Sequence, residues 1–183
     1  MLPEQFCVRM KEMLGEEYAA FYASYDLPKY QALRINPLKT ERDTFLLQAP
    51  FSLNRVPWTT NGYYYSGNDQ PGRHPYHEAG VYYIQEPSAM APAEYLMAEP
   101  GERILDLCAA PGGKSTQIAC SMQGEGLIVC NEIHPARAKI LSENIERMGV
   151  CNALVTNETP QKLSDNFREY FDRILVDAPC SGE

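Results

Sequence analysis

Four short apolar segments alternate with amphipathic segments over residues 103–177, and this alternation constrains the fold more than any other feature. The apolar segments have the length and the Ile, Leu and Val content of buried strands, and in the intervening segments apolar residues recur every three or four positions. Strands that alternate with helices of about 10 to 15 residues build βαβ units and a doubly wound parallel sheet. We therefore expect an α/β fold, with strands at 103–107, 126–131, 153–156 and 173–177 and helices at 114–122 and 135–148.

The chain before this alternation predicts a second, smaller α/β domain. A stripe of apolar residues at helical spacing follows Pro3, and packing into a core is the ordinary role of such a stripe. Other segments alternate as strands do, and Thr40 stands where it could cap a helix. We expect an N-terminal domain at 1–75 and a second domain at 76–183. The elements expected before residue 103 are helices at 3–24, 40–47 and 87–97, strands at 31–36, 61–65 and 81–85, and a loop at 66–75.

The balance of charge argues against simple electrostatic binding of nucleic acid. With 24 acidic and 16 basic side chains, the formal net charge is −8, whereas phosphate binding normally needs a basic surface. An RNA-binding role would require basic residues gathered on one face, or basic sequence outside these 183 residues. The candidates near the N-terminus are Lys29, Arg34, Lys39, Arg42 and Arg55, although scattered charges usually mark a solvated surface.

Composition also narrows the location and the class of cofactor. No apolar run approaches the roughly 20 residues of a membrane-spanning helix, and the N-terminal residues lack the apolar core of a signal peptide, so we expect a cytoplasmic protein without membrane contact. The six cysteines form no Cys-x-x-Cys pair, so reduced thiols are expected. His74 and His77 stand in a loop-like stretch without a third ligand, and no metal site is expected.

A turn rich in small residues links the first strand of the alternation to its helix. Small side chains let a ligand approach the backbone, and the first amides of the following helix point at whatever binds. The glycine spacing fits neither the G-x-G-x-x-G pattern nor a Walker loop, and a plain tight turn is the alternative. The candidate binding residues of this turn are Cys108, Ala109, Ala110, Pro111, Gly112, Gly113 and Lys114.

Acidic residues and a cysteine follow two further strands. Glu132 comes directly after the second strand, where nucleotide-binding sheets place a carboxylate against ribose hydroxyls, although capping of the next helix is the alternative. Asp177 and Cys180 follow the fourth strand, at the edge where open α/β sheets bind their ligands. The alternative is that Cys180 is a buried structural residue and that Asp177 caps a helix. Together with the turn, Glu132 indicates an adenosine-containing ligand.

These motifs together resemble the Sun (Fmu) family of RNA cytosine-5 methyltransferases. The similar segments are residues 108–114 and 177–182, the Asn131-Glu132 pair, and the preceding Tyr83-Ile84-Gln85-Glu86-Pro87-Ser88. Residues 32–39, Ala-Leu-Arg-Ile-Asn-Pro-Leu-Lys, resemble the family's N-terminal signature, so the resemblance covers nearly the whole chain. It implies an incomplete Rossmann-like methyltransferase sheet that binds S-adenosylmethionine, preceded by a small α/β N-terminal domain that could contact RNA. Ribosomal RNA is the substrate expected first, with transfer RNA as the alternative.

The resemblance also implies a role for each candidate residue. S-adenosylmethionine would lie across residues 108–114, with its ribose on Glu132. An Asp follows the third strand in the family, whereas here the adenine contact would fall to Asn157 or Glu158. Asp177 would stand between the cofactor and a flipped cytosine, where it would bind the edge of the base.

Methylation of carbon 5 of cytosine needs a thiolate. Addition of the thiolate at carbon 6 makes carbon 5 nucleophilic enough to attack the methylsulfonium, and a base then removes the carbon-5 proton. The resemblance assigns the attack to a cysteine in a downstream Thr-Cys-Ser motif, which these 183 residues lack, and assigns Cys180 to the later elimination and product release. DNA cytosine-5 methyltransferases use the corresponding Pro-Cys cysteine as nucleophile. Attack by Cys180 is therefore the alternative, which the RNA-family motifs disfavour.

The sequence stops directly after the fourth expected strand, which would leave an apolar strand edge open to association with another chain. We therefore expect the cofactor-binding portion of a methyltransferase that is inactive alone. The alternative from another class is a non-catalytic module that binds the cofactor or RNA.

Overall fold

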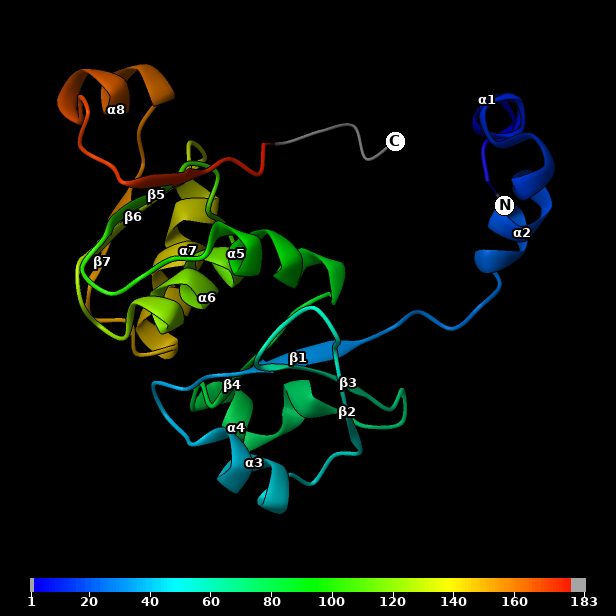
Figure 1. Ribbon diagram of the computed structural model, residues 1–183, viewed down its shortest axis with the longest axis horizontal. Helices are drawn as coiled ribbons and strands as arrows, with labels where there is room; N and C mark the ends of the chain where they lie inside the picture. The colour runs from blue at the N-terminus through cyan, green and yellow to red at the C-terminus, as the bar shows by residue number, and fades with distance from the viewer. Residues whose placement is uncertain (1, 179–183) are drawn as a thin grey trace. The chain divides into compact units, whose positions relative to one another are not determined.

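Two four-stranded sheets organise most of the chain, one antiparallel and one parallel (Figure 1). The computed structural model describes residues 2–178. Its contacts divide the chain into a helical segment, Met1–Tyr30, and a larger unit, Gln31–Glu183, which holds both sheets. Within the described residues, no helix has the length and the apolarity that crossing a bilayer requires.

The helical segment consists of α1 (Glu4–Leu14), a 3₁₀ turn (Gly15–Glu17) and α2 (Tyr18–Ser24). The expectation of one continuous helix is wrong, because Gly15 adopts a φ of 54°, which ends α1. Aromatic side chains of the segment contact one another, as Phe21 and Tyr25 do with ring centroids 5.3 Å apart. Within this segment no residue of α1 or α2 is buried, and packing of the stripe into a core stays a prediction.

The antiparallel sheet has the strand order β2–β3–β1–β4. Its strands are β1 (Ala32–Ile35), β2 (Leu53–Arg55), β3 (Gly62–Tyr65) and β4 (Tyr82–Ile84), and two helices, α3 (Arg42–Gln48) and α4 (Pro75–Glu78), accompany them. The short elements β2 and α4 were not expected. The helix expected from Thr40 begins at Arg42 instead, with Glu41 as its N-cap and without a side-chain cap.

Strand β1 is buried on both faces. Leu33 and Ile35 pack with Phe45 and Tyr82 in one core cluster, while Arg34 points to the opposite face and reaches the helix α6 (Gly113–Met122), which packs against the parallel sheet. Since β4 pairs with β1, this sheet includes residues on both sides of the boundary expected near residue 75. A division of the chain at that residue stays a prediction.

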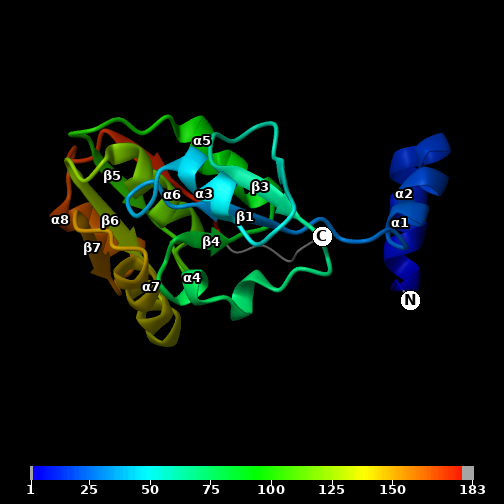
Figure 2. The same cartoon turned by 90° about the horizontal axis from the view of Figure 1, so that it is seen from below.

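The parallel sheet has the strand order β7–β6–β5–β8, and the expected α/β fold is confirmed. Helices α5, α6 and α7 share one core cluster with one face of β5 and β6, and α8 packs on the opposite face (Figures 1 and 2). Of these helices, α8 was not expected. The strands are β5 (Arg103–Asp106), β6 (Leu127–Asn131), β7 (Ala153–Thr156) and β8 (Arg173–Leu175); the helices are α5 (Ala91–Leu96), which follows a 3₁₀ turn (Ser88–Met90), α6 (Gly113–Met122), α7 (Pro135–Arg147) and α8 (Pro160–Asn166).

Strand β8 pairs with β5 alone among the strands in residues 2–178. Ile174 of β8 and Val176, which follows the strand, are each 54% exposed, as expected for an apolar sheet edge with one neighbour. Association of a second chain with this edge stays a prediction.

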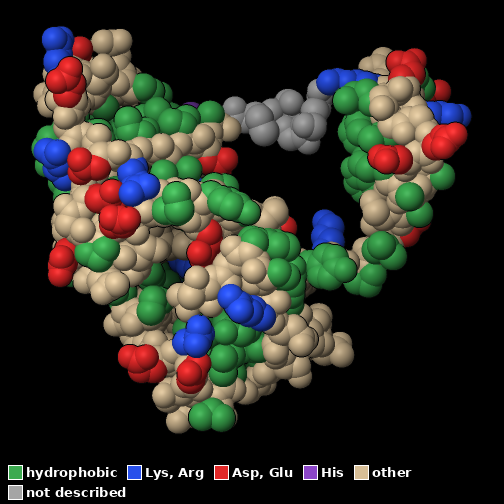
Figure 3. Space-filling view, viewed as in Figure 1, with side chains coloured by type: hydrophobic (Ala, Val, Ile, Leu, Met, Phe, Trp, Pro, Cys, Tyr) green, Lys and Arg blue, Asp and Glu red, His purple; other side chains and the backbone are tan. Residues whose placement is uncertain are grey.

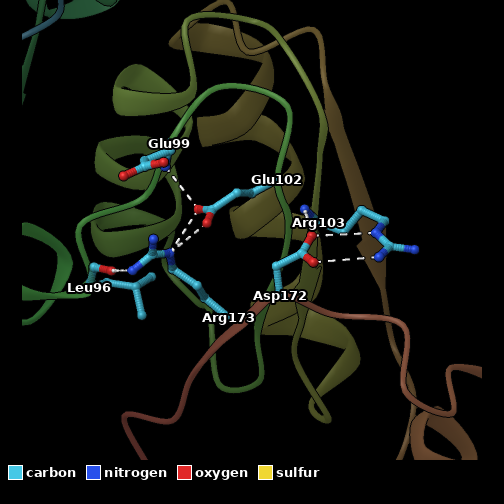
Figure 4. A network of polar contacts seen from close by, with 6 residues as sticks. All are labelled: Leu96, Glu99, Glu102, Arg103, Asp172 and Arg173. Carbon is cyan, nitrogen blue, oxygen red and sulfur yellow. Dashed lines mark hydrogen bonds and ion pairs between the residues drawn. The ribbon is translucent and has the colours of Figure 1, made fainter.

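Two ion pairs cross between the starts of β5 and β8 (Figure 4). Glu102 precedes β5 and pairs with Arg173 of β8 at 2.8 Å, while Arg103 of β5 pairs with Asp172, which precedes β8, at 3.4 Å. Arg173 also donates to the carbonyl oxygen of Leu96 at 2.9 Å. Because each strand carries an acid followed by an arginine at its start, a shift of β8 that set Arg173 opposite Arg103 would also set Asp172 opposite Glu102. The pairs therefore favour the observed register, which sets where β8 ends.

We expect Arg173→Met to lower the midpoint of urea unfolding more than Arg103→Met does. The Glu102–Arg173 pair is the less exposed one, with side chains 19% and 28% exposed against 45% and 41% for Arg103 and Asp172. Hydrogen bonds from Arg173 lower the pKa of Glu102. The pair therefore stabilises the fold above the ordinary carboxyl pKa, and this contribution is lost as the pH falls through the lowered one. Unfolding curves at neutral and acidic pH measure the effect, and equal losses for the two variants at neutral pH would contradict it.

Candidate functional site

The carboxyl ends of β5, β6 and β8 surround two adjoining cavities. The larger has a volume of about 540 Å³ and lies between the turn after β5 and the residues that follow β6, with Glu132 and Arg137 in its lining. The smaller, about 250 Å³, lies between the same turn and residues 83–86. Both cavities are lined by Cys108, Ala110 and Asp177, so one elongated ligand could occupy the two together.

The turn after β5 is held by hydrogen bonds from neighbouring elements. The amide of Ala109 donates to the carbonyl oxygen of Asn131 at 2.8 Å, and Arg137 donates to the carbonyl oxygen of Ala110 at 2.8 Å. Gly112 has a φ of 111°, which other residues rarely adopt, and α6 begins at the next residue. Of the predicted turn residues, Ala109, Ala110 and Gly112 are buried, Cys108, Gly113 and Lys114 are half-buried, and Pro111 is exposed.

Glu132 is a buried carboxylate with two partners. It is 3% exposed, pairs with Arg137 at 3.3 Å and accepts a hydrogen bond from the amide of His134 at 3.0 Å. Arg137 therefore bridges the carboxylate and the turn after β5, which fixes one against the other. The sequence pattern did not single out Arg137; its only signal there was a basic residue one helical turn inside α7.

The two residues predicted to contact adenine have other partners. The side-chain amide of Asn157 donates to the carbonyl oxygen of Glu132 at 2.6 Å, and Glu158 pairs with Lys162 at 2.8 Å. Neither side chain is among those that line the larger cavity, whereas Pro160 is. Their role toward a ligand stays a prediction.

Asp177 pairs with Lys114 at 2.6 Å, which joins the end of β8 to the first turn of α6. Its side chain is 55% exposed and faces both cavities. Cys180, the predicted assisting cysteine, lies outside the described residues. Burial, and then the carboxylates of Asp106, Glu132 and Asp177, raise the pKa of Cys108. The Cys108 thiol therefore keeps its proton at neutral pH and is not suited to nucleophilic attack.

Asp106 is a further polar group of the site that the sequence did not single out. It is 1% exposed, accepts a hydrogen bond from Ser115 at 2.7 Å through one oxygen, and its other oxygen has no partner in the structure. Burial raises its pKa to about 6, and the effect is partly opposed by the Ser115 hydroxyl, the charge of Lys114 and the nearby backbone amide of Cys108. A buried carboxylate oxygen without a partner, in the lining of the smaller cavity, is suited to receive a cationic or hydrogen-bonding group of a ligand.

We expect the free energy of unfolding of the wild type to fall between acidic and neutral pH because of Asp106, and we expect Asp106→Asn to abolish this fall. As the pH rises above 3.8, the ordinary pKa, the unfolded chain ionises Asp106 while the folded chain keeps the proton until about 6. The wild type therefore loses on the order of 2 to 3 kcal/mol over this interval, and the variant does not. Unfolding at several pH values measures this, with the exposed Asp165→Asn as control. Parallel pH profiles for wild type and Asp106→Asn would refute the expectation.

Comparison with known proteins agrees with this geometry. Residues 2–87 match the model of the N-terminal domain of 16S rRNA methyltransferase RsmF, and residues 93–183 match that of 16S rRNA methyltransferase RsmB/F. The chain belongs to this methyltransferase family. The resemblance drawn from its motifs is thereby confirmed.

Individual relatives cover the whole chain. It is 39% identical over 192 residues to ribosomal RNA small subunit methyltransferase F of Citrobacter koseri, and 38% identical over 192 residues to that of Enterobacter sp.. Each match takes in 99% of this chain but 40% of the relative, so the chain spans about two fifths of their length. A solved methyltransferase homolog from Pyrococcus horikoshii is 30% identical with a TM-score of 0.87, over 99% of this chain and 60% of that one.

The surface of this family member carries no single basic area on the face that Figure 3 shows, where Lys and Arg side chains are interspersed with Asp and Glu. Of the basic residues proposed to meet RNA, Arg42 pairs with Asp43 at 3.0 Å, and Lys39 donates to the carbonyl oxygens of Ala79 and Arg147. In residues 2–178, no three His, Cys, Asp or Glu side chains are arranged to hold a metal ion.

Proposed function

We propose that this chain binds S-adenosylmethionine across the two adjoining cavities. It would thereby form the cofactor-binding part of an enzyme that methylates carbon 5 of cytosine in small-subunit ribosomal RNA. The observation that carries the proposal is the convergence of three carboxylates, Asp106, Glu132 and Asp177, with the first turn of α6 at one edge of the parallel sheet. When bound, the cofactor supplies a methyl group carried on a sulfonium ion.

The residues present fit the chemistry of this cofactor. Glu132 can accept hydrogen bonds from the two ribose hydroxyls, in the larger cavity, where adenosine would lie. The unpartnered oxygen of Asp106 suits the ammonium group of the amino-acid end, and the first amides of α6 suit its carboxylate. The ribose and the two charged groups of the amino-acid end would thus each meet a complementary group of the chain. Asn157 and Glu158 remain our candidates for adenine.

The remaining part of the proposal concerns the base. Asp177 is held by Lys114 beside the turn, exposed to solvent, and we propose that it binds the edge of the target cytosine next to the cofactor. The small-subunit ribosomal RNA substrate is supported by the names of the relatives, and a protein that acts on it would work in the cytoplasm. Residues 1–75 stay candidates for RNA contact, with Lys29 and Arg55 as the basic residues to test.

We expect Glu132→Ala to weaken binding of S-adenosylhomocysteine, the demethylated product, by about 10- to 100-fold, because a charge-assisted hydrogen bond contributes roughly 1.5 to 3 kcal/mol. Isothermal calorimetry on the 183-residue chain measures this. Glu143→Ala, which removes a 63% exposed carboxylate from the same helix as Arg137, should bind as the wild type does. Absence of binding by the folded wild type at about millimolar ligand would defeat the proposed function.

We also expect residues 1–183 alone to bind the cofactor without turnover, because Cys108 holds its proton and the chain has no Thr-Cys-Ser motif. Transfer of a radiolabelled methyl group to 16S ribosomal RNA, with transfer RNA as the second substrate, measures this. Turnover that Cys180→Ala abolishes would show instead that Cys180 is the nucleophile.

A further inference from the structure

Arg34 is a buried cation that reaches from the antiparallel sheet to the first turn of α6. It is 2% exposed. Its Nη1 donates to the carbonyl oxygen of Gly113 at 2.7 Å and to the side-chain oxygen of Gln85, and its Nη2 donates to Thr116 Oγ1 at 2.8 Å. The guanidinium also lies over the ring of Tyr83, 5.5 Å from its centroid. So deep a side chain cannot meet an RNA phosphate, and the expectation that it might is wrong.

The groups that accept hydrogen bonds from Arg34 in the structure are all uncharged. They are a backbone carbonyl, a hydroxyl and the side-chain amides of Gln85 and Gln117, and Nε of Arg34 has no partner. The nearby carboxylate, Glu94, is hydrogen-bonded to Gln117 and not to Arg34. Burying a guanidinium that no carboxylate contacts directly is costly, and well-packed apolar side chains often join two elements at least as stably. The arginine is therefore better explained by what its hydrogen bonds orient than by the stability it adds.

What they orient is the pair of peptide units at the start of α6. A peptide unit is planar and trans, so a Gly113 carbonyl directed to Arg34 aims the amide N–H of Lys114 to the opposite side. Thr116 links Arg34 to the preceding peptide unit as well. Its hydroxyl accepts a hydrogen bond from Arg34 and donates one to the carbonyl oxygen of Gly112 at 2.7 Å. That carbonyl shares its peptide with the amide of Gly113. Gly113 and Lys114 both line the smaller cavity.

On the other side of the turn, Gln85 and Tyr83 leave the backbone of Gly113 little room to move. A Cβ added to Gly113 would lie 3.4 Å from the side-chain nitrogen of Gln85 and 3.4 Å from the ring of Tyr83. The same smaller cavity holds the unpartnered oxygen of the buried Asp106. The residues whose amides Arg34 orients therefore line the same cavity as the unpartnered carboxylate oxygen.

We propose that Arg34 is a positioning residue for the amino-acid end of the cofactor, which it serves by orienting the amides of Gly113 and Lys114. The inference rests on the function proposed above. Arg34 lines neither cavity, and Glu132, which would hold the ribose, belongs to the larger cavity, away from the arginine's partners. A change at Arg34 should therefore weaken ligands that carry the amino-acid end and leave adenosine affected little.

The test compares S-adenosylhomocysteine with adenosine as calorimetric probes. Arg34→Lys keeps a cation but loses the planar fork that serves Gly113 and Thr116 together. Thr116→Val keeps Arg34 and the side-chain shape but removes the hydroxyl that connects to Gly112. The control is Arg73→Met, at an exposed position of the same unit. We expect the ratio of the two affinities, S-adenosylhomocysteine over adenosine, to fall about tenfold in Arg34→Lys, in the same direction but less in Thr116→Val, and to stay unchanged in the control.

Each outcome of this test either supports or contradicts the proposed role of Arg34. A ratio equal to that of the wild type in a folded Arg34→Lys overturns the proposal, even if the thermal midpoint falls, because a purely structural brace would weaken both probes alike. If Arg34→Lys does not fold, Thr116→Val decides in the same way. A wild type that binds neither probe would contradict the proposed function itself, whereas a wild type that binds both, with unchanged ratios in the variants, contradicts the role of Arg34 alone.

Discussion

The amide of Asn131 joins the ends of three strands, and the candidate site depends on it. Its nitrogen donates to the carbonyl oxygens of Leu107 and Glu158, and its oxygen accepts from the hydroxyl of Thr156 and the amide of Glu158. An asparagine side chain has two donor hydrogens and two acceptor positions, so its whole capacity is used. Because the residue is 1% exposed, water cannot replace a lost partner. Glu132, the next residue, thus stands at a fixed place beside the turn after β5.

Around this fixed edge, three carboxylates differ in their partners. Glu132 is paired with Arg137 and Asp177 with Lys114, whereas Asp106 has a hydroxyl for a partner and a pKa raised to about 6 by burial. The oxygens of the paired carboxylates can accept hydrogen bonds from hydroxyls or from a base edge. An unpaired buried one gains most from a cation that arrives with its ligand. Because the three carboxylates differ in their partners, each suits a different chemical group of one ligand bound at this edge of the sheet.

An acidic site has a consequence for the proposed RNA substrate. Carboxylates that attract a sulfonium and an ammonium group repel phosphates, and the chain as a whole carries a formal charge of −8. Several of its basic side chains are committed to the fold, as Arg34, Arg137 and Lys39 are to backbone carbonyls. RNA contact by this chain would have to overcome that repulsion, which extends about 10 Å at 0.1 M salt and shortens as salt is added.

Apart from β2, the strands could be predicted, as could the helices α5, α6 and α7, because each depends on local periodicity. The turn after β5 could be predicted from its small residues. The roles of Arg34 and Asp106 could not. Alternation shows that Arg34 lies on the opposite face of β1 from Leu33, and an arginine on such a face is ordinarily solvated. Here α6 covers that face, and no local pattern in residues 31–36 announces a helix 80 residues later in the chain. A charged residue that a neighbouring element covers must be satisfied by that element's polar groups. Where those groups are backbone carbonyls at the start of a helix, the hydrogen bonds that satisfy the buried charge also orient the amides of the helix.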